Sequence, residues 1–137
     1  MLQVKSRGDT SRGVRFMATI CLYQDTRHAD TLLWMREVFS IGYISHRKDG
    51  ITELKINGFD SVHQVLTQLQ PYVKFKQVQV SALLRACILL RTTKIGQLNE
   101  FQLRELVDIV FLIKQHNYKS HATLSKDSLL HRLGLTP

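Results

Sequence analysis

The sequence predicts an α+β domain in which two antiparallel β-hairpins form a four-stranded sheet and helices pack on one face of that sheet. Two segments, residues 2–24 and 42–58, alternate between apolar and polar residues around a turn, as half-buried strands do. The chain after residue 60 instead repeats its apolar residues at helical spacing. Its 137 residues suffice for one buried core, so we expect a single domain over residues 1–137.

The first predicted hairpin lies in residues 2–24. Its first strand, LQVKSRG, places Gln3, Lys5 and Arg7 on one face. The next residues, GDTSRG, are turn formers. The second strand, VRFMATICLYQ, directs Arg15 and Met17 outward, while its inward apolar residues are Val14, Phe16, Ala18, Ile20 and Leu22. Both strands therefore carry an outward face that begins with basic side chains.

A short helix and the second hairpin are predicted next. The segment DTRHADTLLWMREVFSIG is expected to start at an N-cap, Thr26, and its apolar face comprises Leu32, Met35 and Phe39. The dipeptide Asp49-Gly50 between two alternating runs is a strong hairpin signal. The outward residues of this hairpin are Tyr43, Ser45, Arg47, Glu53 and Lys55, and its inward residues are Ile44, Leu54 and Ile56.

Four helical segments are predicted after the second hairpin. The first repeats its apolar residues with helical periodicity from about residue 60 until Pro71 ends or kinks it. The second is expected from about Lys74 to about Leu90, and the third, EFQLRELVDIVFLIKQHN, has one apolar stripe. A polar loop, NYKSHAT, separates it from a last short helix that we expect Ser125 to cap.

The net charge of the sequence narrows the classes of partner that we expect. Nineteen Lys and Arg residues against eleven Asp and Glu give a net charge of +8, which favours a polyanion and most often a nucleic acid. No apolar stretch is long enough to span a bilayer, so we expect no membrane partner. Cys21 and Cys87 lie far apart without paired His or Cys spacing, so we expect buried thiols rather than a disulfide or a metal site.

The outward hairpin faces suggest DNA recognition. A two-stranded ribbon fits the major groove, and Gln, Lys, Arg, Ser and Glu side chains can bind base edges or phosphates. The alternative is that these side chains form the ordinary solvated face of a half-buried sheet.

Two segments resemble a known family. ICLYQDTRHADTLLWMREVFSIGYISHRKDGITELKING, followed by LTQLQPYVKFKQ, resembles the LAGLIDADG homing endonucleases, in particular the small homodimeric group encoded in organellar introns. The resemblance runs from Gln3 to about Gln79 and continues only as a similar order of helices. It implies a saddle-like sheet that binds double-stranded DNA, a homodimer, Mg²⁺ as cofactor, and an organelle, either chloroplast or mitochondrion, as the location.

The resemblance also implies roles for individual residues. The catalytic residues that it implies are Gln24, His28 and Lys76. Without the resemblance, the alternative is that they are a polar residue at a strand end, a surface histidine in the first turn of a helix and a surface lysine. The DNA-binding residues that it implies are Gln3, Lys5, Arg7, Arg15, Met17, Ser45, Arg47, Glu53, Lys55 and Lys119. Arg7 and Arg47 would pair with guanine, Gln3 with adenine and Glu53 with cytosine, while Lys119 would bind phosphate.

One family feature has no counterpart in residues 1–137. The motif that gives the family its name is an apolar helix ending in the acidic metal ligand. Matching the strands places this helix upstream of Met1, so the sequence is expected to be truncated at its N-terminus relative to the family. We therefore assign no metal ligand and expect little or no cleavage by these residues alone. The alternative function is a non-cleaving nucleic-acid binder, either an RNA maturase with intron RNA as partner or a DNA-binding remnant.

Overall fold

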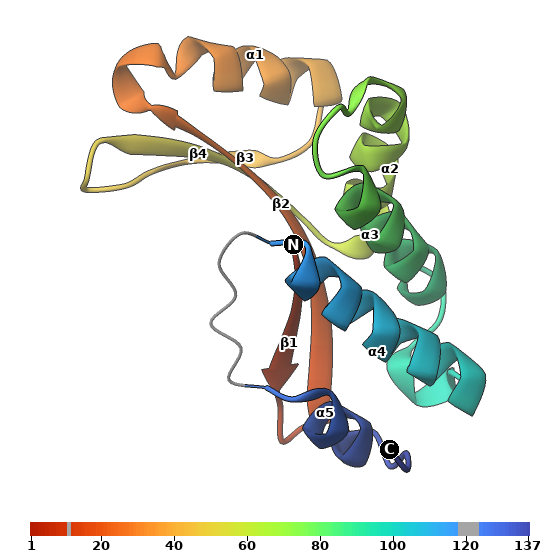
Figure 1. The fold of residues 1–137 in the computed structure, drawn as a ribbon. Helices are drawn as coiled ribbons and strands as arrows, with labels where there is room; N and C mark the ends of the chain where they lie inside the picture. Colours follow the sequence, from red (N-terminus) through yellow and green to blue (C-terminus); the bar gives the residue numbers. More distant parts are fainter. Residues whose placement is uncertain (11, 118–123) are drawn as a thin grey trace.

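A computed structural model describes residues 1–10, 12–117 and 124–137. Four strands form one antiparallel sheet in the order β1-β2-β4-β3 (Figure 1). These strands are β1 (Leu2–Ser6), β2 (Val14–Asp25), β3 (Tyr43–His46) and β4 (Ile51–Asn57). The helices are α1 (Asp30–Phe39), α2 (Phe59–Leu69), α3 (Gln77–Leu90), α4 (Glu100–Gln115) and α5 (Lys126–Arg132), and three short 3₁₀ turns are η1 (Thr26–His28), η2 (Gln70–Tyr72) and η3 (Ile95–Gln97). This architecture confirms the predicted α+β class.

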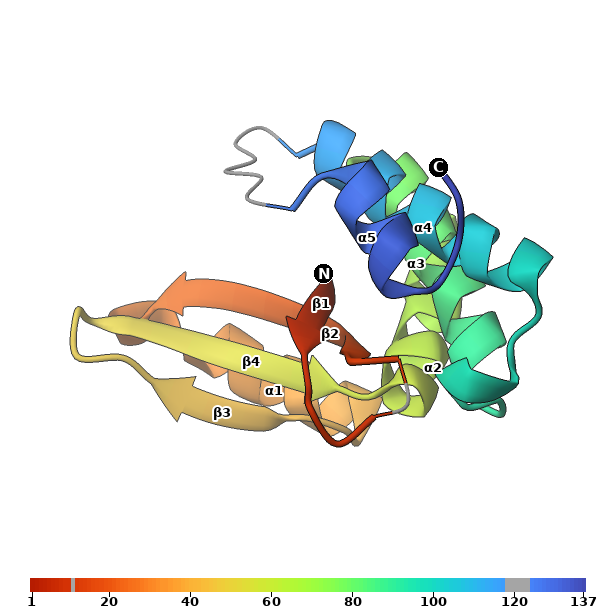
Figure 2. The same cartoon turned by 90° about the horizontal axis from the view of Figure 1, so that it is seen from below.

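Strand β2 joins the two hairpins into one sheet. Its first part pairs with β1, from Ser6 opposite Val14 to Leu2 opposite Ala18. Its second part pairs with β4, from Thr19 opposite Asn57 to Asp25 opposite Ile51. The two hairpins therefore lie one after the other along β2, as the long curved strand in Figures 1 and 2 shows.

The core lies on one face of the sheet, as the alternation predicted. From β2 and β4 it takes Val14, Phe16, Ala18, Leu54 and Ile56, all nearly or fully buried. Helices α1 and α2 pack against β2 and β4, while α4 packs against β1. The apolar stripe predicted for α4 is buried as well, namely Leu103, Leu106, Val107, Val110 and Ile113. The outward face of the strands is thus left for polar side chains and solvent.

Two predicted helix starts are wrong. Thr26 does not cap α1: Asp25 caps the preceding turn η1 by accepting a hydrogen bond from the Arg27 amide, and α1 starts only at Asp30. Helix α3 starts at Gln77 rather than near Lys74, because Lys76 has a left-handed backbone (φ 59°) that a right-handed helix cannot contain. The predicted cap at Ser125 is confirmed, since its hydroxyl accepts from the Ser128 amide.

Within the described ranges, no helix is long and apolar enough to cross a membrane.

Candidate nucleic-acid interface and catalytic residues

In the second hairpin, strand pairing places predicted DNA-binding residues opposite one another. We call a set of residues that lie opposite one another across neighbouring strands a row. Ser45 of β3 lies opposite Glu53 of β4, and β4 places Lys55 two residues further on the same face. Each row continues onto β2, where Glu53 meets Tyr23 and Lys55 meets Cys21. These β2 residues and Tyr43, opposite Lys55 on β3, were not among the predicted DNA-binding residues. The β2–β4 register would have been needed to join them to the rows.

The two tyrosines give this face large exposed surfaces. Tyr23 is 56% exposed and Tyr43 is 50% exposed. Aromatic side chains of this size on a polar sheet face offer apolar contact to a partner, such as the methyl group of thymine in a major groove. The pairing of β4 with β2 and with β3 thus adds two aromatic candidates to a set of charged ones.

Glu53 is held by two basic neighbours. It is only 5% exposed, and the Lys55 ammonium and the Arg47 guanidinium contact its two carboxylate oxygens. Arg47 also forms an ion pair with Asp49. The hydrogen bond from Lys55 is the main reason why the pKa of Glu53 lies below its ordinary value of 4.5. In the free protein, Glu53 therefore orders Lys55 and Arg47, and a contact with cytosine would have to compete with both.

This arrangement predicts a specific acid sensitivity. Because the pKa of Glu53 is lowered by folding, its ion pairs stabilise the protein above pH 4.5, and this stabilisation is lost as the pH falls below that value through the depressed pKa. Denaturant unfolding measured from about pH 6 down to about pH 3 should show this loss. Glu53→Gln should remove that part of the pH dependence. Glu37→Gln, on exposed α1 surface, should keep the wild-type profile, and equal profiles for all three proteins would contradict the assignment.

The first hairpin forms a second group of predicted DNA-binding residues. Gln3 lies opposite Met17 and Lys5 lies opposite Arg15 in the β1–β2 pairing. Two like charges directly opposite each other on a strand pair are destabilising in water. A bound polyanion would remove that repulsion. Arg7, beyond the end of β1, is paired with Asp9 at 2.8 Å.

The predicted catalytic Gln24 and His28 lie where β2 leads into α1. Both are exposed, and the Gln24 side chain accepts a hydrogen bond from the Asp25 amide at 3.1 Å. The turn that carries His28 is tied to β4 by a hydrogen bond of 3.0 Å between the hydroxyls of Thr26 and Thr52. The fully buried Thr52 also bonds His46 Nδ1 at 2.9 Å, which links this turn to β3.

Lys76 lies near the N-terminus of the chain. Its charge reaches the Met1 amino group, whose pKa is lowered mainly by burial and further by Lys76. That amino group donates to the Thr19 carbonyl at 2.6 Å. Gln24 follows Thr19 by five residues of extended strand, which is roughly 16 Å. Within the described residues, no hydrogen bond joins Lys76 to Gln24, whose side chain bonds the Asp25 amide instead.

The described residues do not fit a Mg²⁺ site. Among residues 1–10, 12–117 and 124–137, no three His, Cys, Asp or Glu side chains are grouped so that they could hold a metal ion. Asp25 is the carboxylate adjacent to Gln24, and it binds the Arg27 guanidinium through both of its oxygens at 3.0 and 2.9 Å. Mg²⁺ needs carboxylate or other oxygen ligands in octahedral arrangement, so we assign no chemical step to a metal in this chain.

Lys119, the predicted phosphate ligand, lies outside the described residues.

The chain is similar to DNA endonucleases in sequence. It is 27% identical over 92 residues to the DNA endonuclease I-CvuI of Chlorella vulgaris, and the match covers 67% of this chain and 57% of that protein. The match thus spans somewhat more than half of the relative's length. No family model matches the chain.

Solved structures of homing endonucleases share the fold. I-CvuI, in complex with the I-CreI target in the presence of Mg and with the DNA not cleaved, superposes with a TM-score of 0.78 at 21% identity and covers 99% of this chain and 86% of that one. The archaeal intron-encoded homing endonuclease I-Vdi141I, complexed with DNA, has a TM-score of 0.82 at 18% identity and covers 97% of this chain and 84% of that one. The fold of this chain is therefore that of proteins solved on DNA.

Proposed function

Because this chain is similar in sequence to a DNA endonuclease and has the fold of homing endonucleases, we propose that it is a member of the LAGLIDADG homing endonuclease family and that it binds a specific site in double-stranded DNA through the outward face of its four-stranded sheet. The observation that carries the proposal is the continuity of that face. The Gln3–Met17 and Lys5–Arg15 pairs on the first hairpin and the Ser45–Glu53 row on the second lie along the one strand β2. A sheet face of this kind can follow a major groove over several base pairs.

The nucleobase that each side chain is proposed to contact follows from hydrogen-bond donor and acceptor geometry. Arg47 presents a guanidinium that can pair with guanine, and Gln3 presents an amide that suits adenine. Glu53 holds Lys55 and Arg47 in place until DNA competes for them. Lys119 is proposed to bind phosphate, so its removal would weaken all sequences alike.

We further propose that the family reaction, phosphodiester cleavage at the centre of the DNA site, uses Lys76, Gln24 and His28. Lys76 would place a positive charge near the scissile phosphate, and the two polar side chains would order water around it. Cleavage also needs acidic ligands for Mg²⁺, and these have to come from outside the described residues. DNA binding is therefore proposed for the chain itself, and cutting only for an assembly that contains those ligands.

A homodimer is part of the proposal. Two aromatic side chains precede Lys76 in the chain and are largely solvent-exposed, Tyr72 by 77% and Phe75 by 85%, and a second copy would cover them. The relative in Chlorella vulgaris supports the further proposal of an organellar location.

The function is tested by binding and cutting assays on two versions of the protein. One is the chain as it stands, and the other carries a family-type helix ending in Asp in front of Met1. DNA sites are first selected from random duplexes with each version. We expect both versions to bind, and only the grafted version to cut with Mg²⁺.

Each other outcome has a definite meaning. If both versions bind and neither cuts, the catalytic roles of Gln24, His28 and Lys76 are wrong and the binding function stands. If neither version retains duplex DNA even at low salt, the proposed function is wrong. A preference of the chain for intron RNA over duplex DNA would favour the maturase alternative.

A further inference from the structure

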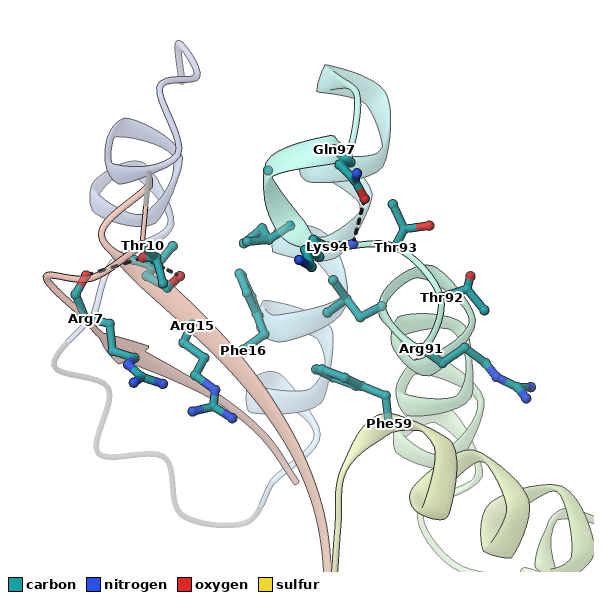
Figure 3. Close-up of a pocket in the computed structure, with 14 residues that line it drawn as sticks. Arg7, Thr10, Arg15, Phe16, Phe59, Arg91, Thr92, Thr93, Lys94 and Gln97 are labelled. Atoms are coloured by element: carbon teal, nitrogen blue, oxygen red, sulfur yellow. Dashed lines mark hydrogen bonds between the residues drawn. The ribbon is translucent and has the colours of Figure 1, made fainter.

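A hollow of about 680 Å³ lies beside the first hairpin, away from the rows described above. Its walls come from the hairpin, from the start of α2 and from the segment between α3 and α4 (Figure 3). Phe16, Phe59 and Ile95 line it, and Figure 3 shows the Phe59 ring pointing from α2 toward the hairpin. The hollow thus has an apolar floor between two separate parts of the chain.

Four basic residues line the hollow and no acidic residue does. Two of the four are already paired: Arg7 with Asp9 at 2.8 Å and Arg91 with Asp60 at 3.0 Å. The guanidinium of Arg91 also points away from the hairpin in Figure 3. The remaining two, Arg15 on the hairpin and Lys94 on the opposite wall, are exposed.

Arg15 and Lys94 carry charges that nothing nearby balances. No ion pair within the described part of the chain includes either residue. An anion entering the hollow would therefore meet two available cations and no carboxylate in its lining. The apolar floor would keep water away from that anion and strengthen the attraction.

The position of Arg15 indicates which anion arrives there. Arg15 lies directly opposite Lys5 in the β1–β2 pairing and also lines the hollow, so the hollow borders the positive charge of the proposed DNA-binding face. A DNA backbone that follows this hairpin would pass Lys5 and Arg15 and then reach Lys94. A phosphodiester backbone has the matching chemistry: phosphates for the two cations and deoxyribose for the apolar floor.

We propose that this hollow binds the sugar–phosphate backbone of the DNA flanking the site, with Arg15 and Lys94 contacting phosphates across a floor formed by the half-buried Phe59 and Ile95. The inference rests on the proposed DNA-binding function and adds a site to it. The contact is independent of base sequence, because it involves only the backbone. It extends the bound length of DNA beyond the bases that the hairpin faces.

The test compares the charge-removing variants Lys94→Gln and Arg15→Gln with a matched control, Arg36→Gln. Arg36 is exposed on α1, which packs against β2, β3 and β4 and does not line the hollow. The affinity of each protein for a selected duplex with long flanks is measured as a function of salt. We expect the slope of log K against log salt to fall by about 0.9 for each phosphate contact removed, by about twice that in the double variant, and not to change in the control.

A second measurement shortens the flanks of the same duplex stepwise. The wild-type protein and the Arg36→Gln control should lose affinity once the duplex ends before the hollow, whereas the double variant should show no such loss. If the double variant keeps the wild-type salt slope and the wild-type response to shortening, the hollow is not a backbone site, although the DNA-binding function stands. If the wild-type protein binds no duplex at all, the proposed function and this inference are both wrong.

Discussion

Gly42→Ala is expected to lower the free energy of unfolding by about 3 kcal/mol. Gly42 has φ +104°, which side-chain-bearing residues rarely adopt, and it is the residue before β3. A Cβ at this position would lie 2.9 Å from the Lys55 carbonyl oxygen and 3.0 Å from the side chains of Leu54 and Ile56. Neither the backbone of β4 nor these buried side chains can move away without cost. Denaturant unfolding would measure the loss.

Gly50→Ala is the matched control. Gly50 also has a positive φ of +79°, but a Cβ there would meet no atom within 4 Å. Its cost should be that of the left-handed backbone alone, about 1 kcal/mol. Equal destabilisation by the two changes would contradict the steric explanation at Gly42. Because Gly42 adjoins the row of Tyr43 and Lys55, Gly42→Ala should also weaken DNA binding more than Gly50→Ala does.

Lys76→Gly is expected to raise stability and remove cutting at the same time. In the version that carries the acidic helix, cleavage should fall by at least about a hundredfold, since the substitution removes the positive charge that we propose acts at the scissile phosphate. Lys76 has φ 59°, and relief of left-handed strain, about 1–2 kcal/mol, exceeds the extra chain entropy of glycine, about 0.5–1 kcal/mol. The free energy of unfolding should therefore rise by about 0.5 kcal/mol.

Ser40→Gly provides the control for that change. Ser40 is the other non-glycine residue with positive φ within the described ranges, at 53°, and it ends α1. Its replacement should give a similar gain in stability without loss of cutting. If Lys76→Gly cuts as fast as the Ser40→Gly protein, Lys76 has no part in the chemistry. If it loses stability, its left-handed backbone is not a source of strain.

Much of the fold could be predicted because alternation and turn residues are local signals. A few neighbouring residues suffice to predict each of three features: the turn at Asp49-Gly50, the inward residues of β2 and the capped start of α5. The start of α3 could not be read in this way. Nothing in the type of Lys76 favours a left-handed backbone, so the residue type gives no sign that the helix begins only at Gln77.

The candidate site was less predictable, because it depends on contacts distant in sequence. Alternation showed that Glu53 faces outward, but its burial beneath Lys55 and Arg47 depends on side-chain pairing. The rows that add Cys21 and Tyr23 depend on the β2–β4 register. The hollow between Arg15 and Lys94 joins segments about eighty residues apart. The roles of Gln24, His28 and Lys76 came from the family resemblance and stay predictions.

The central claim is that the outward sheet face reads DNA sequence, and selection from random duplexes tests it most directly. The wild-type protein and Arg47→Ala are each used to enrich bound duplexes, which are then sequenced. Wild type should enrich one defined site, and Arg47→Ala should enrich the same site with the preference for guanine lost where Arg47 makes its contact, at a cost of about 1–3 kcal/mol there. Enrichment of no sequence by the wild-type protein, or of an unchanged site by Arg47→Ala, would contradict the claim.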